Sequence, residues 1–463
     1  MPLTKDQQGA LQFLKDFVNS KEPAAVLYGA AGTGKTYVLK HFLNEYKKAV
    51  AVTAPTHAAV RNAERMTGKK GLTVHSLHGL RLNVDIANFN IDNMQFDPLA
   101  EPKLPNYSLI IEDECSMVNN GLYQLDIQRA KQFGVKILYV GDALQLPPID
   151  ETISKTFHTK LRYELREIIR QENGHPLGDV LMLSRSDIEN NKTDAITYLI
   201  KNASRIINNK GYYKVISSDF DNTIRKYFST RSVDEISGTK ILAFRNDTVD
   251  YYNHLSRMSR FKGVNDLIVK DEYLIGYKTI FDRLMNPLII NSIPYLVTDV
   301  EHDMCDYEFH TYRVNMIDLM FNKIVPPIEI VDHKSSTYNN FLDILNQFYQ
   351  NALIAPRQER SRAWKQYFEF KNRFMSMVNI THFNGKTINK DLSYGYAMTI
   401  HKAQGSTFKN TFVCMDDVLS MRDVMNGGDF ILPTKKEDRI FKNKLLYVAL
   451  SRTQNIAVIK FNF

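Results

Sequence analysis

The sequence has few cysteines, no long apolar run and no repeated or low-complexity segment. Its three cysteines, Cys115, Cys305 and Cys414, stand alone and form no Cys-x-x-Cys pair. This argues against a disulfide framework and against a cysteine-rich zinc site, and it fits a reducing compartment. No run of about 18 apolar residues is present, so we expect no membrane span. Residues 1–12 are polar and lack the apolar core of a signal peptide.

Length and composition describe a globular protein of several domains. A chain of 463 residues exceeds what one hydrophobic core usually organises, so about two to four domains are expected. Apolar residues make up 44% of the chain and charged residues 24%, which is typical of soluble domains. The net charge of +8 is compatible with a polyanionic partner but does not identify one.

One segment carries a complete phosphate-binding motif. It fits G-x-x-x-x-G-K-[ST] and follows an apolar run at 24–28 that predicts a buried strand; a helical pattern at 37–46 comes after it. Glycines allow a tight turn whose N–H groups converge on phosphate oxygens, and the positive end of the following helix points at the same anion. The lysine supplies a charge for the β- and γ-phosphates, and the last hydroxyl is a Mg²⁺ ligand. The motif consists of Gly29, Ala30, Ala31, Gly32, Thr33, Gly34, Lys35 and Thr36.

Polar residues that follow two further predicted strands complete the expected chemistry. The strand at 108–111 leads into Asp113 and Glu114. Asp113 is placed to hold Mg²⁺, directly or through water, and Glu114 to orient or deprotonate an attacking water. The strand at 136–140 leads to Gln145, a candidate sensor of the γ-phosphate. These residues predict hydrolysis of a nucleoside triphosphate.

Two arginines are candidates for stabilising transition-state charge. Arg170 ends the segment 163–170, and Arg452 follows a helical pattern near the C-terminus. An arginine supplied by another domain makes hydrolysis depend on domain closure. From the pattern alone, a surface salt bridge is the commoner role for either residue.

The order of strand and helix patterns predicts an α/β chain with two insertions. Alternation in the first 170 residues favours a parallel sheet covered on both faces, and a second such pattern begins near residue 210 and resumes near 395. The segment 79–106 has the alternation of a β-hairpin. The aromatic-rich segment 251–395 suggests a small β-unit with strands at 295–300, 311–316 and 328–331 and two helices at 338–349 and 357–377. The expected domains are 1–78 with 107–175, 79–106, 176–250 with 396–463, and 251–395.

Motifs spread over almost the whole chain resemble those of the superfamily 1 helicases. The likeness is to the RecD-like 5′→3′ branch, in particular to the Dda helicases of tailed bacteriophages. The matching segments are 3–7, 54–59, 73–76, 113–114, 141–145, 170, 243–249, 399–407 and 447–452. Arg245 departs from the family pattern, because it stands where a threonine is usual.

The resemblance implies two RecA-like domains with ATP and Mg²⁺ in the cleft between them. It assigns Gln7 to the adenine, Gly405 to the nucleotide, Thr36 and Asp113 to the metal, and Lys35, Glu114, Gln145, Arg170 and Arg452 to catalysis. Segment 79–106 corresponds to a pin, or wedge, that splits the duplex, and 251–395 to an SH3-like domain with a helical tower. Expected nucleic-acid contacts are Pro55, Thr56, His57, His75, Ser76, Phe89, Phe96, Thr399 and His401.

Several of these assignments have simpler alternatives. His57 and His75 are equally suited to be buried cap or turn residues, and Phe89 and Phe96 to pack under their own hairpin. The basic and aromatic segment 357–368, which contains the only tryptophan, Trp364, is more typical of an amphipathic helix with a solvated basic face than of a DNA contact.

The expected activity is ATP-driven, 5′→3′ unwinding of DNA by a protein that acts on single-stranded DNA and at single-strand/duplex junctions. The resemblance also implies a monomer in the cytoplasm of a bacterium or phage-infected cell, with a single-strand binding protein or replisome component as possible partner. An RNA-directed helicase stays open, since these motifs grip the backbone. A non-motor ATPase switch or kinase would not need Arg452 or the hairpin. A nuclease subunit would need a carboxylate cluster that is not found here.

Overall fold

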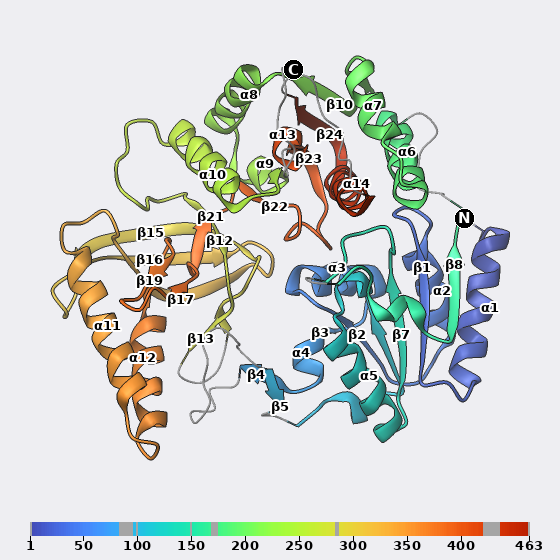
Figure 1. Ribbon diagram of the computed structural model, residues 1–463, viewed down its shortest axis with the longest axis horizontal. Coiled ribbons are helices and arrows are strands. Elements are labelled where there is room, and N and C mark those ends of the chain that lie inside the picture. The colour runs from blue at the N-terminus through green and yellow to red at the C-terminus, as the bar shows by residue number, and fades with distance from the viewer. Residues whose placement is uncertain are drawn as a thin grey trace.

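Three six-stranded sheets organise the chain in the computed structural model (Figure 1). The structure describes residues 2–82, 96–98, 101–148, 151–167, 175–282, 287–419 and 436–461. Among the helices of these ranges, none combines the length and the apolarity that crossing a bilayer requires.

The first sheet is parallel throughout and has the strand order β3-β2-β6-β7-β1-β8. The three strands predicted at 24–28, 108–111 and 136–140 are present as β1, β6 and β7, each within one residue of its predicted ends. The short edge strands β3 and β8 were not predicted. The bounds are β1 (Ala24–Gly29), β2 (Val50–Ala54), β3 (Gly71–Thr73), β6 (Leu109–Glu112), β7 (Lys136–Gly141) and β8 (Leu161–Leu165).

Continuous apolar strands are explained by helices on both faces of this sheet. Ala25 and Leu27 of β1 pack against α1 (Lys5–Asn19) and α2 (Lys35–Glu45). Their neighbours Ala24 and Val26 point to the opposite face, toward α4 (Val74–Leu77), η1 (Leu104–Asn106) and α5 (Asn120–Phe133). Because successive side chains alternate between faces, a strand buried on both sides needs an apolar residue at every position.

The second sheet has the same construction and the order β22-β11-β23-β24-β10-β9, with only β9 antiparallel. One face carries α6, α7 and α14, and the other carries α8, α9 and α10. Strand bounds are β9 (Arg205–Ile207), β10 (Lys210–Val215), β11 (Thr239–Ala243), β22 (Ala397–Thr399), β23 (Phe408–Cys414) and β24 (Thr453–Lys460). Helix bounds are α6 (Pro176–Asn190), α7 (Asp194–Lys201), α8 (Ser217–Thr230), α9 (Val233–Ser237), α10 (Asn246–Arg260), α13 (Met415–Leu419) and α14 (Lys436–Ser451). These two layered sheets have the RecA-like α/β architecture that the sequence predicts.

The third sheet, built from the chain between β11 and β22, is mainly antiparallel, with the order β18-β17-β16-β15-β12-β21. Its bounds are β12 (Tyr273–Gly276), β15 (Pro294–Met304), β16 (His310–Asp318), β17 (Lys323–Val331), β18 (Phe374–Met375) and β21 (Leu392–Tyr394). Two small hairpins accompany it, β13 (Ile280–Phe281) with β14 (Pro287–Ile289) and β19 (Ile380–Thr381) with β20 (Thr387–Ile388).

Both helices expected after this β-unit are present as α11 (Tyr338–Ile354) and α12 (Arg360–Arg373), which pack side by side (Figure 1). Trp364 is only 3% exposed and belongs to their aromatic core with Tyr349 and Phe370. The segment is therefore an amphipathic helix, and its tryptophan points into the protein.

A buried ion pair fastens the third sheet to the second. Arg257 of α10 donates from Nε to Glu272 Oε2 at 2.8 Å, and Tyr396 donates to Glu272 Oε1 at 3.2 Å. Burial raises the pKa of Glu272 to about 7, against the opposing effect of Arg257. Nearby, Lys240 of β11 donates to the Tyr273 hydroxyl of β12 at 2.9 Å. These directional contacts fix the orientation of one sheet relative to the other.

The predicted hairpin segment is described only at its base. There β4 (Leu80–Leu82) pairs antiparallel with β5 (Phe96–Pro98), next to α4. Phe89 and the side chain of Phe96 lie outside the described residues, as does Arg170.

Candidate functional site: the cleft between the two parallel sheets

The phosphate-binding loop has the strand–loop–helix geometry that its sequence predicts. β1 ends at Gly29, and α2 begins at Lys35 after two residues in the left-handed region, Gly32 (φ 91°) and Gly34 (φ 85°). A Cβ on Gly29 would lie 2.4 Å from the Leu165 carbonyl oxygen, so only glycine fits where β1 passes β8.

Charge and hydroxyl groups converge on this loop. Lys35 Nζ donates to the carbonyl oxygens of Gly29 at 2.6 Å and Ala30 at 3.1 Å. Thr33 Oγ1 donates to Ala30 O at 3.0 Å. The ammonium group is thereby kept within the loop, and Thr36 follows it on the first turn of α2. The loop is suited to hold a polyphosphate with its N–H groups, one lysine charge and the helix N-terminus.

Gln7 lies against the same loop. It is 2% exposed, forms a capping box with Thr4 at the start of α1, and its Nε2 donates to Thr33 O at 3.5 Å. The capping box fixes the position of this amide beside the loop. Its role in reading adenine stays a prediction.

The acidic turn after β6 lies beside the phosphate loop, close enough for Lys35 to act on Asp113. Asp113 Oδ1 accepts from the Glu114 backbone N–H at 2.9 Å, and Glu114 has the left-handed φ of 54°. Burial raises the pKa of Asp113, although Lys35 acts in the opposite direction. Burial also raises the pKa of Glu114 to about 7, with Arg452 lowering it and Asp113 raising it further. A carboxylate in this range is suited to accept a proton near neutral pH.

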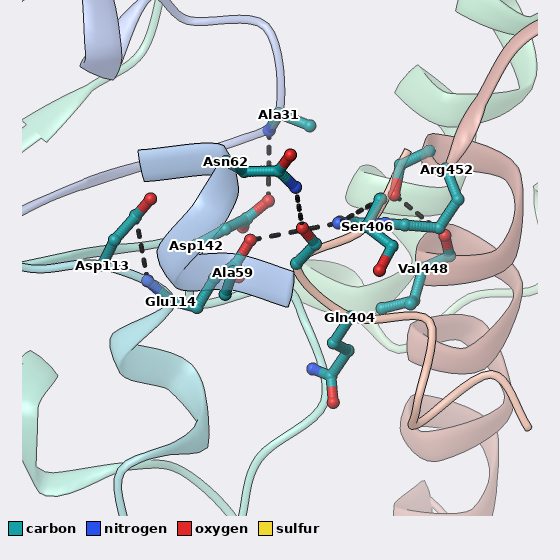
Figure 2. Close-up of polar contacts among 12 residues, drawn as sticks. Ala31, Ala59, Asn62, Asp113, Glu114, Asp142, Gln404, Ser406, Val448 and Arg452 are labelled. Carbon is teal, nitrogen blue, oxygen red and sulfur yellow. Dashed lines mark hydrogen bonds and ion pairs between the residues drawn. The ribbon is translucent and has the colours of Figure 1, made fainter. Parts of the chain in front are cut away.

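Glu114, Gln145 and Arg452 meet at the centre of the cleft. The Gln145 amide is assigned the orientation in which it donates to Glu114 Oε2 at 3.3 Å and accepts from Arg452 Nη2 at 3.3 Å, because the opposite orientation would set oxygen against oxygen and nitrogen against nitrogen. Arg452 Nη1 is 4.0 Å from Glu114 Oε1 and donates to Ser406 O at 3.3 Å (Figure 2). Arg452 follows α14 of the second sheet, whereas its two partners belong to the first.

The turn after β22 belongs to the second sheet and contacts α3 (His57–Thr67) of the first (Figure 2). Gly405 has φ 73°, and a Cβ there would lie 2.9 Å from the Ala59 Cβ. Its carbonyl accepts from Asn62 Nδ2, and the neighbouring Gln404 Nε2 donates to Leu146 O at 3.2 Å. Glycine at 405 therefore permits the two halves of the cleft to touch.

The sequence did not predict a second set of contacts between the two sheets, which holds the phosphate loop. The Ala31 N–H donates to Asp142 Oδ2 at 3.1 Å and to the Tyr447 hydroxyl at 3.0 Å, while Arg185 Nη2 donates to Ala31 O at 2.8 Å. Tyr447 and Arg185 come from α14 and α6 of the second sheet. Asp142 and Tyr447 lie inside motifs that the sequence already showed; Arg185 gave no signal.

The expected nucleic-acid contacts fall on loops and helix starts of both halves. Thr56 caps α3 by accepting from Ala59 N at 3.2 Å. On the other half, Thr399 ends β22 opposite Ala243 of β11. Burial lowers the pKa of His57, His75 and His401 alike, so each favours the neutral form. Pro55 precedes Thr56, and Ser76 accepts from Lys103 Nζ at 3.3 Å.

Arg245, the residue that departs from the family pattern, is held by an ion pair. Its Nε donates to Asp417 Oδ1 at 2.5 Å, and Asp417 Oδ2 accepts from the backbone N–H groups of Phe244 and Arg245 at 2.7 and 2.8 Å. The nearly buried Asp417 thus fixes the start of α10.

Metal binding in this cleft would use few protein ligands. Within the described ranges no group of three or more His, Cys, Asp or Glu side chains is arranged to hold a metal ion. One hydroxyl and one carboxylate, from Thr36 and Asp113, fit Mg²⁺, which takes one or two protein ligands together with water and substrate phosphates.

Comparison with known proteins agrees with this geometry. The family described as AAA domain matches residues 2–207. The ATP-dependent DNA helicase Dda of Enterobacteria phage T4 is 26% identical over 446 residues, which cover 89% of this chain and 92% of the phage protein. An uncharacterized protein of Acanthamoeba polyphaga mimivirus is 24% identical and covers 90% of this chain and 94% of its own length. These likenesses support the resemblance to the Pif1/RecD-like superfamily 1 helicases.

Further relatives also match over most of this chain and most of their own length. The ATP-dependent DNA helicase Pif1 of Campylobacter jejuni is 23% identical over 94% of this chain and 87% of its own length. Among solved structures, Bacteroides Pif1 in complex with ADP-AlF3 and single-stranded DNA covers 99% of this chain and 92% of its own, with 17% identity and a TM-score of 0.49.

We expect Lys35→Ala to lower ATP turnover by roughly 100-fold or more, because it removes the one side-chain cation within the phosphate loop. Steady-state phosphate release measures the loss, and thermal unfolding checks that the fold is intact. Lys40→Ala, an exposed position on the same helix, is the matched control and keeps parental turnover. Parental turnover by Lys35→Ala would refute the site.

The pKa of Glu114 predicts a rise in ATPase efficiency with pH. Since only the ionised carboxylate accepts a proton and its fraction grows through about pH 7, kcat/KM for ATP should increase between about pH 6 and about pH 8. Glu114→Gln should be slow throughout and should lack this rise. A parent profile that is flat over the same interval contradicts the assignment.

Proposed function

We propose that this chain is an ATP-dependent DNA helicase that translocates 5′→3′ along single-stranded DNA and unwinds duplex with its inserted hairpin. The observation that carries the proposal is the meeting of Glu114 and Gln145 with Arg452 across the cleft. Two relatives that span most of the chain, from phage T4 and Campylobacter jejuni, are named ATP-dependent DNA helicases.

The cleft supplies each group that hydrolysis of the γ-phosphate needs. Thr36 and Asp113 would hold Mg²⁺, which when bound would neutralise phosphate charge. Glu114 takes the proton of the attacking water, and Gln145, which already touches this carboxylate, orients that water. Arg452 offers its guanidinium to the charge that develops in the transition state. Arg170 is a second arginine with this proposed role.

Hydrolysis is coupled to movement because the reacting groups belong to two bodies. ATP attracts Lys35 from the first sheet and Arg452 from the second, so its binding favours a closed cleft. Loss of the γ-phosphate removes the shared ligand and favours opening. Each body has its own group of candidate strand contacts, Thr56, His57, His75 and Ser76 on the first and Thr399 and His401 on the second. Alternating grip by the two groups converts opening and closing into steps along the strand.

The direction and the wedge are finer parts of the proposal. The 5′→3′ direction rests on the family resemblance. The wedge is supported by the antiparallel pairing of β4 with β5, which places a hairpin base beside α4. The third sheet with α11 and α12 is assigned to the SH3-like domain and its tower. Our proposal puts this motor in the cytoplasm of a bacterial or phage-infected cell, acting as a monomer beside a single-strand binding protein or replisome component.

Strand displacement on tailed duplexes tests the function and its direction together. The full chain with ATP and Mg²⁺ should separate a DNA duplex that carries a 5′ single-stranded tail and leave the matched 3′-tailed duplex largely paired. RNA versions of both substrates report whether the sugar matters. Separation of the 3′-tailed duplex alone would refute the direction, separation of RNA alone would refute the DNA substrate, and no separation at all would refute the helicase.

The wedge makes a separate prediction. Replacing both Phe89 and Phe96 with alanine should cut the unwinding rate far more than the ATPase rate stimulated by single-stranded DNA, because stacking on a base is worth about 1–3 kcal/mol. Phe383→Ala, an exposed aromatic outside the hairpin, is the control and should change neither rate. Equal losses of unwinding and ATPase activity would contradict the wedge.

A further inference from the structure

A buried polar cluster lies beneath the hairpin base, outside the nucleotide cleft. It contains His78, Asp126 and Tyr139, each fully buried, and Arg129, which is 9% exposed. His78 Nε2 lies 2.6 Å from Asp126 Oδ1, and the Tyr139 hydroxyl donates to Asp126 Oδ2 at 3.0 Å. Arg129 Nη1 lies 3.1 Å from His78 Nδ1 and also donates to the His78 carbonyl oxygen.

The contacts fix the tautomer of His78. Arg129 has only N–H donors, so His78 Nδ1 must accept, and the ring proton must be on Nε2. Nε2–H then donates to Asp126, whose other oxygen accepts from Tyr139. The imidazole is therefore held through both ring nitrogens and through its own backbone carbonyl, which leaves the ring and the chain at this point a single orientation.

His78 lies between α4 and the base of the hairpin. It is the residue after α4, whose His75 and Ser76 are candidate strand contacts, and it precedes Gly79 (φ 64°) and β4. The returning chain reaches the same place, because Lys103 N donates to Leu77 O at 2.8 Å and Lys103 Nζ to Ser76 Oγ at 3.3 Å. The other members of the cluster belong to the first sheet and its helices: Asp126 and Arg129, the partners of His78, lie on α5, and Tyr139, which donates to Asp126, lies on β7.

Stability is a weak explanation for such a cluster, since well-packed apolar groups often replace buried charges without loss. What the hydrogen bonds add is direction. An apolar contact would allow the chain after α4 to pivot, whereas three directed contacts at one residue resist rotation about that point.

We propose that His78, Asp126, Arg129 and Tyr139 are positioning residues that hold the base of the hairpin in a fixed orientation to α4. This inference rests on the proposed helicase function. Force generated by closure of the cleft reaches α4 through the first sheet. The cluster around His78 transmits that force to the hairpin, so that each step of the protein along the strand pushes the hairpin against the duplex junction. Without this cluster, the protein still steps along a single strand, but the hairpin yields.

The experiment compares unwinding with ATP consumption in the full chain. His78→Leu removes both side-chain hydrogen bonds of His78 and leaves the bond between Tyr139 and Asp126 in place. His78→Gln keeps an amide N–H near the position of Nε2, and Tyr139→Phe removes one hydrogen bond to Asp126 with little change of volume. Arg257→Met, which breaks the equally buried ion pair with Glu272 far from the hairpin, is the control for general loss of stability.

We expect His78→Leu to lower the number of base pairs separated per ATP by about tenfold, the equivalent of one buried hydrogen bond to a charged group. Its ATPase rate on single-stranded DNA should stay within about twofold of the parent, because its nucleotide cleft is unchanged. Tyr139→Phe should lower the number of base pairs separated per ATP by less than His78→Leu does. His78→Gln should give a value between those of His78→Leu and the parent. Arg257→Met should lower the melting temperature and leave the ratio unchanged.

An unchanged ratio in both His78→Leu and Tyr139→Phe would overturn the positioning role, and so would an equal fall of the ratio in Arg257→Met. Should His78→Leu fail to fold, Tyr139→Phe and His78→Gln decide the matter by the same ratio. Failure of the parent to separate any duplex would refute the proposed function itself, which the parent arm of the experiment reveals independently of the variants.

Discussion

The contact that Gln145 makes with Glu114 on one side and Arg452 on the other is the interaction on which the rest of this structure depends. The carboxylate and the amide follow strands of the first parallel sheet, and the guanidinium follows the last helix of the second. Burying an acid costs free energy unless a partner compensates it, and here the partner is supplied by another body. The proposed catalytic groups are therefore brought together only while the two sheets approach each other.

The remaining architecture serves to make that approach specific. Gly405 lets the turn after β22 sit on α3, and Tyr447 and Arg185 grip Ala31 in the phosphate loop from the second sheet. On the far side, the Arg257–Glu272 pair ties the third sheet to the second, so these two sheets are positioned as one unit against the first. The His78 cluster does the same for the hairpin base on the first sheet. In the proposed motor, movement is therefore concentrated between the first and second sheets.

Local chemistry explains what the sequence could predict. The phosphate loop and the turn at Asp113 and Glu114 are contiguous motifs, and the central strands are mostly apolar because helices cover both faces. The edge strand β8, Leu161–Leu165, has a mixed pattern and was not predicted, because only Leu165 among its five residues is buried. The grip of Arg185 and Tyr447 on Ala31 joins residues far apart in the chain, and no local pattern encodes it. Likewise, only packing against α11 shows that Trp364 points inward. The roles of Phe89 and Arg170 stay predictions, since both lie outside the described residues.

The central claim is that hydrolysis in this cleft is controlled by a polynucleotide lying across both bodies. The most direct measurement is the rate of phosphate release by the full chain, with and without single-stranded DNA, for the parent and for Arg452→Ala. We predict that single-stranded DNA raises the rate of phosphate release several-fold or more in the parent and little or not at all in Arg452→Ala. A parent rate that single-stranded DNA leaves unchanged would contradict it.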